Sequence, residues 1–185
     1  ACYSYLADSL NSSTALFLKG KTGDAIELLL KPLKHCKGNA AAYYTLGLFY
    51  FFYMDYNNAE SYFKQAVALD KELAYAYKML GAIYFDKGNL VKAEEYWKQA
   101  LSGGRQDAST FNELGLLLMS LERYDESLFY LRKAVNLEPW NKDYLYSLAS
   151  VYRDSNMFKE AISWYRKLEG LQPDYPNLHN DLGDI

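Results

Sequence analysis

A period of 34 residues runs through almost the whole of this 185-residue chain. Small residues recur at this spacing, at Ala25, Ala59, Ala93, Ser127 and Ala161. In the same register, leucine is followed by a small residue at Leu46-Gly47, Leu80-Gly81, Leu114-Gly115, Leu148-Ala149 and Leu182-Gly183. An unvarying period over successive copies indicates a stack of similar units, in which each unit buries apolar surface against its neighbours.

Large residues occupy further columns of the same period. Two columns flank the leucine pairs, at Tyr43, Tyr77, Phe111 and Leu145 and at Tyr50, Tyr84, Leu118 and Tyr152. Later columns hold Phe63, Trp97, Leu131 and Tyr165, and then Ala66, Ala100, Ala134 and Leu168. This pattern, which Pro139 and Pro173 close in two copies, resembles the tetratricopeptide repeat family over nearly the whole chain. The resemblance implies an all-α fold, a right-handed superhelical solenoid of antiparallel helix pairs.

The period divides the chain into units that we expect to form one solenoid domain. They are a degenerate repeat or cap at 1–39, repeats at 40–73, 74–107, 108–141 and 142–175, and the start of a further repeat or a capping helix at 176–185. The first unit departs most from the pattern, because its leading columns are polar and Pro32 replaces a small residue. Proline breaks a helix interior, so we expect that helix to end or kink near Leu30. Residues 1–18 are then expected to pack as an end cap rather than as a faithful repeat.

The columns have a physical interpretation of their own. Each unit is predicted to contain two helices of apolar period 3.6 that are joined by a short polar turn. Gly20 and Gly88 are expected to end the first helix of their units. The small residues Gly47, Gly81, Gly115 and Ala149 allow the second helix to approach closely, and large residues such as Trp97 and Tyr165 fill the remaining space.

Composition excludes several classes of function. With 20 basic and 23 acidic residues and a formal net charge of −3, the chain has no cationic excess for a phosphate backbone, so we expect no nucleic-acid partner. The longest apolar stretch, 43–54, is too short for the roughly 20 residues of a membrane span. No signal peptide is present, and the start at Ala1 suggests a processed or excised chain. The compartment is therefore open, with the cytoplasm slightly favoured over the periplasm or secretion.

The residues that catalysis and metal binding need are not clustered in the sequence. Neither His35 nor His179 has partners at metal-ligand spacing, and His179 is expected to be a packing residue. The sequence Gly20-Lys21-Thr22 imitates a phosphate-binding loop but has Ala15 where that loop requires glycine, so it is predicted to be a turn. Cys2 and Cys36 occupy equivalent places in adjacent units, too far apart for a disulfide, and are predicted to be free thiols. We expect no enzyme, cofactor or metal.

The family resemblance places the partner-binding residues in a concave groove that is lined by the first helix of each unit. Carried over position by position, the candidates are Tyr44, Leu48, Phe51, Phe52, Tyr75, Lys78, Phe85, Asn112, Leu116, Met119, Tyr146 and Arg153. The Lys/Asn/Arg cluster with which chaperone-binding members hold a terminal carboxylate is not reproduced. The groove is expected to change from aromatic at 40–73 to acidic and polar at 142–185.

These candidates lead to the hypothesis of a non-catalytic interaction scaffold. A helical core explains Leu46, Tyr53 and either Phe49 or Tyr50, but not the further apolar residues of that helix. We therefore predict an apolar surface of Tyr44, Leu48, Phe51, Phe52, Tyr75 and Phe85 that binds a protein segment with apolar anchors and flanking basic residues, at roughly micromolar affinity.

Three alternatives remain open at this stage. Residues 1–18 or a second copy of the chain could cover these rings instead of a partner. The chain could form a self-assembling, homo-oligomeric solenoid, because Leu182-Gly183 begins a helix that nothing in the sequence completes. It could also be the scaffolding arm of a larger protein.

Overall fold

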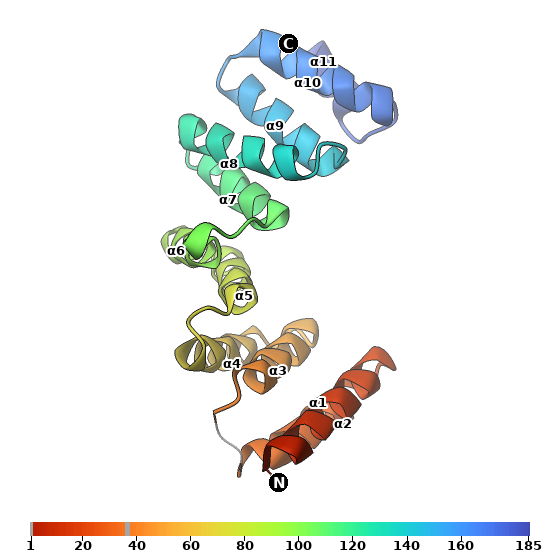
Figure 1. The fold of residues 1–185 in the computed structure, drawn as a ribbon. Helices are drawn as coiled ribbons and strands as arrows, with labels where there is room; N and C mark the ends of the chain where they lie inside the picture. Colours follow the sequence, from red (N-terminus) through yellow and green to blue (C-terminus); the bar gives the residue numbers. More distant parts are fainter. Residues whose placement is uncertain (1, 36–37) are drawn as a thin grey trace. The chain divides into compact units, whose positions relative to one another are not determined.

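The fold is helical throughout the residues that the structure describes. The computed structural model describes residues 2–35 and 38–185, with side chains from Tyr5 onwards, and every regular element among them is a helix (Figure 1). The chain divides into two compact units, Ala1–Ala100 and Leu101–Ile185, each of which contains several repeats. From here on, the first unit and the second unit mean these two parts of the chain. No helix in the described part of the chain is long and apolar enough to span a bilayer.

The first unit consists of three helix pairs. Its helices are α1 (Cys2–Leu18), α2 (Thr22–Leu33), α3 (Ala40–Phe52), α4 (Tyr56–Leu69), α5 (Ala74–Asp86) and α6 (Leu90–Ala100). Each odd-numbered helix packs against the helix that follows it, and α2 and α4 also pack against the next pair. The unit is therefore a stack of helix pairs, as the period predicts.

The second unit repeats this arrangement. A short 3-10 helix, η1 (Ser102–Gly104), precedes α7 (Ala108–Ser120), α8 (Tyr124–Leu137), α9 (Lys142–Asp154), α10 (Phe158–Leu171) and the short α11 (Leu178–Gly183). The pairs are α7–α8 and α9–α10, and α11 packs on α10. Leu178 is fully buried, and it anchors α11 to a core that is built mainly from α8, α9 and α10.

The first helix pair differs in part from the expectation. Helix α2 continues through Pro32 and ends at Leu33, so it does not end near Leu30. Pro32 lacks the N–H that would donate to the Leu28 carbonyl, and the helix ends one residue later. In α1, Ser13 is fully buried in the column that holds glycine elsewhere, and its Oγ donates to the Leu10 carbonyl at 2.9 Å. The Cys2 side chain and Cys36 lie outside the described residues, so the free thiols stay a prediction.

Helix pairs close around the column of small residues. A methyl group added to Gly47 would lie 2.6 Å from the Phe63 ring, and one added to Gly115 would lie 2.5 Å from Leu131 Cγ. In the last pair Ala149 and Tyr165 occupy these places, and both are fully buried. The predicted close approach of the two helices is thus confirmed.

We expect Gly81→Ala to destabilise the first unit. The added methyl group would overlap the indole of Trp97, which is buried at 3% exposure, and such overpacking typically costs 1–3 kcal/mol of unfolding free energy. Chemical denaturation followed by circular dichroism measures the change. Gly170→Ala in α10, where the added methyl group meets no neighbouring atom, is the control and should stabilise slightly. Equal effects of the two substitutions would contradict the packing argument.

The turn inside each helix pair has a left-handed residue at a fixed place. The residues are Gly20, Met54, Gly88, Glu122 and Asn156, with φ between 57° and 76°. The turns predicted at Gly20 and Gly88 are confirmed, and Gly20 and Lys21 form a turn between helices rather than a phosphate-binding loop. The next amide closes each helix, as where Asp55 N–H donates to the Tyr50 carbonyl at 2.9 Å.

Met54→Gly should therefore stabilise the chain, by up to about 1 kcal/mol. Left-handed backbone costs a side-chain-bearing residue about 1–2 kcal/mol, part of which glycine loses again through its larger unfolded-state entropy. The Met54 side chain is 78% exposed, so little packing is lost. Thermal and urea unfolding of Met54→Gly and Met54→Ala separate the two contributions. A gain with alanine equal to that with glycine would show that the backbone conformation is not the cause.

Candidate protein-binding surfaces

Three of the predicted groove residues on α3 are partly buried in the core of the first unit. Tyr44, Leu48 and Phe51 are half-buried and pack against the apolar cluster that α4 and α5 form. The Tyr44 ring centroid lies 5.7 Å from that of Phe63. The core therefore accounts for more of this helix than the sequence pattern indicated.

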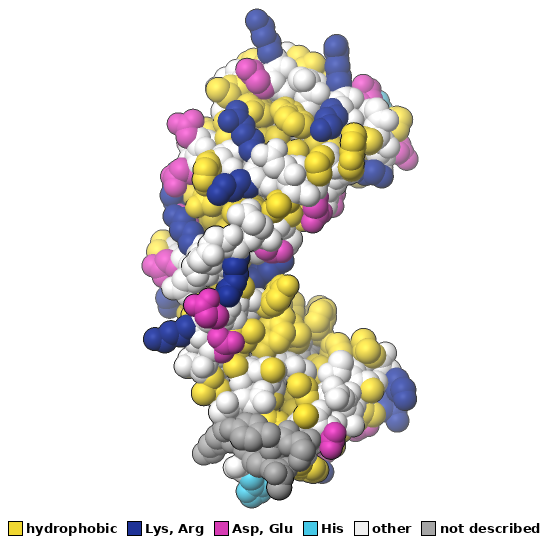
Figure 2. Space-filling model, viewed as in Figure 1, with side chains coloured by type: hydrophobic (Ala, Val, Ile, Leu, Met, Phe, Trp, Pro, Cys, Tyr) yellow, Lys and Arg dark blue, Asp and Glu magenta, His cyan; other side chains and the backbone are white. Residues whose placement is uncertain are grey.

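The other three aromatic residues of the prediction remain exposed. Phe52 is 64% exposed, Tyr75 64% and Phe85 42%, although the Phe85 ring also lies 5.7 Å from Trp97. Figure 2 shows hydrophobic side chains gathered on the face of the first unit, over α3. We call the six predicted residues together the aromatic surface: Tyr44, Leu48, Phe51, Phe52, Tyr75 and Phe85.

The turn after α3 extends this apolar character. Tyr53, which was expected in the core, is 67% exposed, and Met54 beside it is exposed as well. The helix ends at Phe52, so the backbone turns before Tyr53 can reach the core side of α3.

Lys78, another predicted groove residue, is half-buried on α5, and its carbonyl accepts a hydrogen bond from Trp97 Nε1 at 3.2 Å.

Helix α1 covers only part of the rings. The Phe17 ring stacks on Phe49 with a centroid distance of 4.7 Å, and it lies 5.6 Å from Phe52. Phe49 is buried by the first unit's packing, but Phe52 keeps most of its surface in solvent. The alternative that residues 1–18 cover the aromatic surface thus applies to its edge and leaves the rest open.

Two residues of the aromatic surface, Tyr44 and Tyr75, are tyrosines that influence each other electrostatically. Burial raises the pKa of Tyr44, and the proximity of the Tyr75 phenol raises it further. The Tyr44 phenol therefore stays protonated at neutral pH and remains able to donate a hydrogen bond. The surface thus offers hydrogen-bond donors among its apolar rings, as binding surfaces rich in tyrosine do.

The predicted residues of the second unit have a more polar setting. Asn112, Leu116 and Met119 are half-buried on α7, and Asn112 Oδ1 is buried without a hydrogen-bond partner in the described structure. Tyr146 and Arg153 on α9 both form hydrogen bonds with Asp181 of α11. The Tyr146 hydroxyl donates to Asp181 Oδ2 at 2.7 Å, and Arg153 donates to Asp181 Oδ1.

Asp181 was not among the predicted residues. Its carboxylate is buried at 8% exposure, and burial together with its hydrogen bond raises the pKa of Tyr146 to about 12. The pair does not recur at 34 residues, so the period gives no sign of it. His179, expected to be a packing residue, is instead exposed on α11, and Leu178 before it fills the core. Two proposed groove residues are therefore used to hold the last helix.

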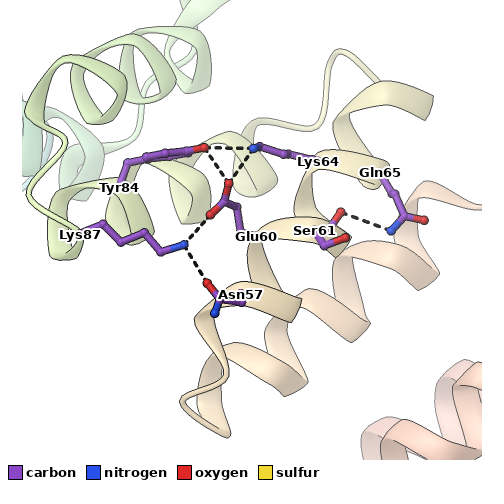
Figure 3. Close-up of polar contacts among 7 residues, drawn as sticks. All are labelled: Asn57, Glu60, Ser61, Lys64, Gln65, Tyr84 and Lys87. Carbon is purple, nitrogen blue, oxygen red and sulfur yellow. Dashed lines mark hydrogen bonds and ion pairs between the residues drawn. The ribbon is translucent and has the colours of Figure 1, made fainter.

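A polar network joins α4 to α5 in the first unit (Figure 3). The Glu60 carboxylate accepts hydrogen bonds from Lys64, Tyr84 and Lys87, each at 2.6 Å. Lys87 also donates to Asn57 at 3.2 Å. Burial alone would raise the pKa of Glu60, but the three hydrogen bonds and the charge of Lys64 outweigh it and lower this pKa to about 2. The Glu60–Lys64 spacing of four residues is the sequence signal that could have revealed this network.

This network should give a pH-dependent contribution to stability. A carboxylate with a lowered folded-state pKa stabilises above its ordinary pKa of 4.5, and the contribution is lost as the pH falls towards 2. Glu60→Gln should lower the unfolding free energy by roughly 1 kcal/mol at pH 7, and the difference from wild type should shrink between pH 5 and pH 2. Urea titrations at several pH values measure it, with the exposed Glu95→Gln as control. A pH-independent difference would contradict this assignment.

Among the described residues, no group of three His, Cys, Asp or Glu side chains is placed to hold a metal ion. Arg123, the N-cap residue of α8, forms an ion pair with Glu126 in the first turn of that helix.

Comparison with known proteins agrees with the helix-pair architecture. A family model described as tetratricopeptide repeat matches residues 55–109 and 112–176, which is more than half of the chain. No curated protein matches the chain. Among solved structures, MamA residues 41 to the end from Desulfovibrio magneticus RS-1 is 20% identical, with a TM-score of 0.83 and coverage of 95% of this chain and 99% of that chain.

Two further solved structures have the same fold. YrrB, described as a TPR protein with an unusual peptide-binding site, has a TM-score of 0.81 at 21% identity and covers 96% of this chain and 91% of its own. PilF of Pseudomonas aeruginosa has a TM-score of 0.81 at 14% identity, with coverage of 99% and 89%. At such identities these similarities establish the fold alone.

Proposed function

Because the chain belongs to the tetratricopeptide repeat family, we propose that it is a non-catalytic scaffold that binds a protein segment through the aromatic surface of its first unit. The observation that carries this proposal is the exposure of Phe52, Tyr75 and Phe85 on helices that are otherwise well packed. Large exposed apolar patches on soluble folds mark interaction sites. The peptide-binding site that is described for YrrB supports the same class of function.

The expected affinity is modest. Burial of an exposed aromatic side chain contributes about 1.5–3 kcal/mol, whereas association costs roughly 4–15 kcal/mol before any net gain. Three exposed rings, helped by the half-buried Tyr44 and Leu48, therefore support binding near the micromolar range. A partner with two or three apolar anchors fits this surface, and basic residues flanking those anchors stay part of the proposal.

Replacement of two exposed rings tests the proposal. The double variant Phe52→Ser/Tyr75→Ser should lose partner binding by at least tenfold while its unfolding free energy changes little, because neither side chain belongs to the core. Partners are isolated with the intact protein, and the isolated segment is then titrated by calorimetry. Val91→Ser, which alters a 69% exposed apolar residue of α6 that is not among the six residues of the aromatic surface, is the matched control.

The same variants separate binding from folding and self-assembly. A melting transition lost in the double variant would show that the rings serve the core, which contradicts the proposal. Light scattering over a range of concentrations measures oligomerisation. A mass that grows with concentration in the wild type, and falls to that of a monomer in the double variant, would show that the aromatic surface serves homo-oligomerisation instead.

A further inference from the structure

One cationic position recurs every 34 residues in the second helix of successive helix pairs. In α4 and α6 of the first unit a carboxylate neutralises it, and in α8 and α10 of the second unit no carboxylate of the described residues does. In the first unit this cation has a carboxylate one turn before it. Lys64 Nζ lies 2.6 Å from Glu60, and Lys98 Nζ lies 2.7 Å from Glu94. The residue after each lysine is a neutral glutamine, Gln65 or Gln99. These positions of α4 and α6 therefore carry no net charge.

The equivalent positions of the second unit carry a net positive charge. At the same 34-residue spacing, Leu128 and Ile162 replace the glutamates, and Arg132 and Arg166 replace the lysines. The glutamines become Lys133 and Lys167. Helix α8 thus has two adjacent cations at positions where α4 and α6 have one lysine that is paired with its own glutamate.

Aromatic rings and a phenol hold the cations of α8 in place. Arg132 donates from Nε and Nη2 to the Tyr152 hydroxyl, at 3.0 and 2.5 Å. Lys133 Nζ lies 4.3 Å above the Phe129 ring and 5.2 Å above Phe111. Neither cation forms an ion pair within the described part of the chain, and cation–π contacts leave the full charge in place.

These cations border a groove of about 400 Å³ beside α8. Leu128, Phe129 and Met157 provide apolar walls, and Asn136 provides an amide. Phe129 is 54% exposed and Met157 43%, so these two walls are open to solvent, whereas Leu128 is buried. Asp125, at the first turn of α8, is the carboxylate that lines the same groove, and it opposes the binding of anions there.

The Glu60 network shows how a carboxylate is bound in this setting. In the first unit, Glu60 accepts from the Tyr84 hydroxyl and from Lys64 (Figure 3). Tyr152 and Arg132 are the residues of the second unit that correspond to Tyr84 and Lys64. The Tyr152 hydroxyl accepts from Arg132 but donates to no acceptor among the described residues. Two of the three donors of the network thus have counterparts in the second unit without the internal carboxylate, whereas Ser155 stands in the place of Lys87.

We propose that this groove binds an acidic protein segment. A carboxylate of the segment pairs with Arg132 and Lys133, and a neighbouring apolar side chain of the same segment packs between Phe129 and Met157. The charge of the groove selects an acidic partner, and its apolar walls select a polypeptide rather than a bare polyanion. This site is separate from the aromatic surface of the first unit, and it would bind a different partner.

Restoring the internal carboxylate tests the proposal. In Leu128→Glu, the new side chain should pair with Arg132 as Glu60 pairs with Lys64, and so exclude the ligand carboxylate. The probe is a fluorescein-labelled peptide, Gly-Asp-Glu-Phe-Asp-Glu-Leu-Gly, titrated with the full chain by fluorescence anisotropy. Leu128→Glu should weaken binding at least tenfold, whereas the neutral Leu128→Gln should stay within about twofold of wild type. Asp125→Asn should tighten binding severalfold.

Further variants keep the proposal falsifiable if Leu128 does not tolerate replacement. Lys133→Glu should abolish binding, and Lys142→Glu, the same charge change at the start of α9, should not. The Phe52→Ser/Tyr75→Ser variant should bind the probe normally, so that failure of this site is distinguishable from failure of the aromatic surface. Equal binding by Leu128→Glu and Leu128→Gln would overturn the proposal. Equal binding of a peptide with Asn and Gln in place of Asp and Glu, or full competition by oligothymidylate, would also overturn it.

Discussion

The fold depends on the contact between a small residue on the first helix of each pair and a large side chain on the second. Gly47 against Phe63, Gly115 against Leu131 and Ala149 against Tyr165 are three forms of this contact. Because the two helices touch at this point, aromatic rings of the two helices also stack on one another, as Tyr50 and Tyr62 do at a centroid distance of 5.3 Å. Several of the 19 tyrosines therefore serve helix pairing through such stacks.

The sequence period was sufficient to predict the helix pairs, because close packing requires the same small and large residues in every copy. The turns at Gly20 and Gly88 followed from the same pattern, but Met54, Glu122 and Asn156 adopt the left-handed conformation without glycine. Helix α2 was expected to end or kink near Leu30, and it continues to Leu33, because the amide missing at Pro32 affects only its last residues. Features that repeat could be predicted, whereas exceptions to the repeat could not.

The candidate sites were harder to predict for the same reason. The column positions identified the exposed Phe52 and Tyr75, but they could not show that Tyr44 and Phe51 lean on the α4–α5 core. Asp181 fixes Arg153 through a contact that occurs once, so no column contains it. The groove beside α8 depends on a difference between equivalent columns, because Leu128 stands where Glu60 and Glu94 stand in the first unit.

The different charge compensation of the two units makes them unequal in their response to ionic strength. In the first unit, the Glu60 network helps to hold α4 against α5. Dissolved ions screen the attraction between the charges of this network. In the second unit, Arg132 and Lys133 of α8 contact aromatic rings and a phenol, and neither forms an ion pair within the described residues. Added electrolyte therefore weakens the contact between α4 and α5, whereas at the equivalent place on α8 it chiefly dampens the attraction of Arg132 and Lys133 for charges outside the molecule.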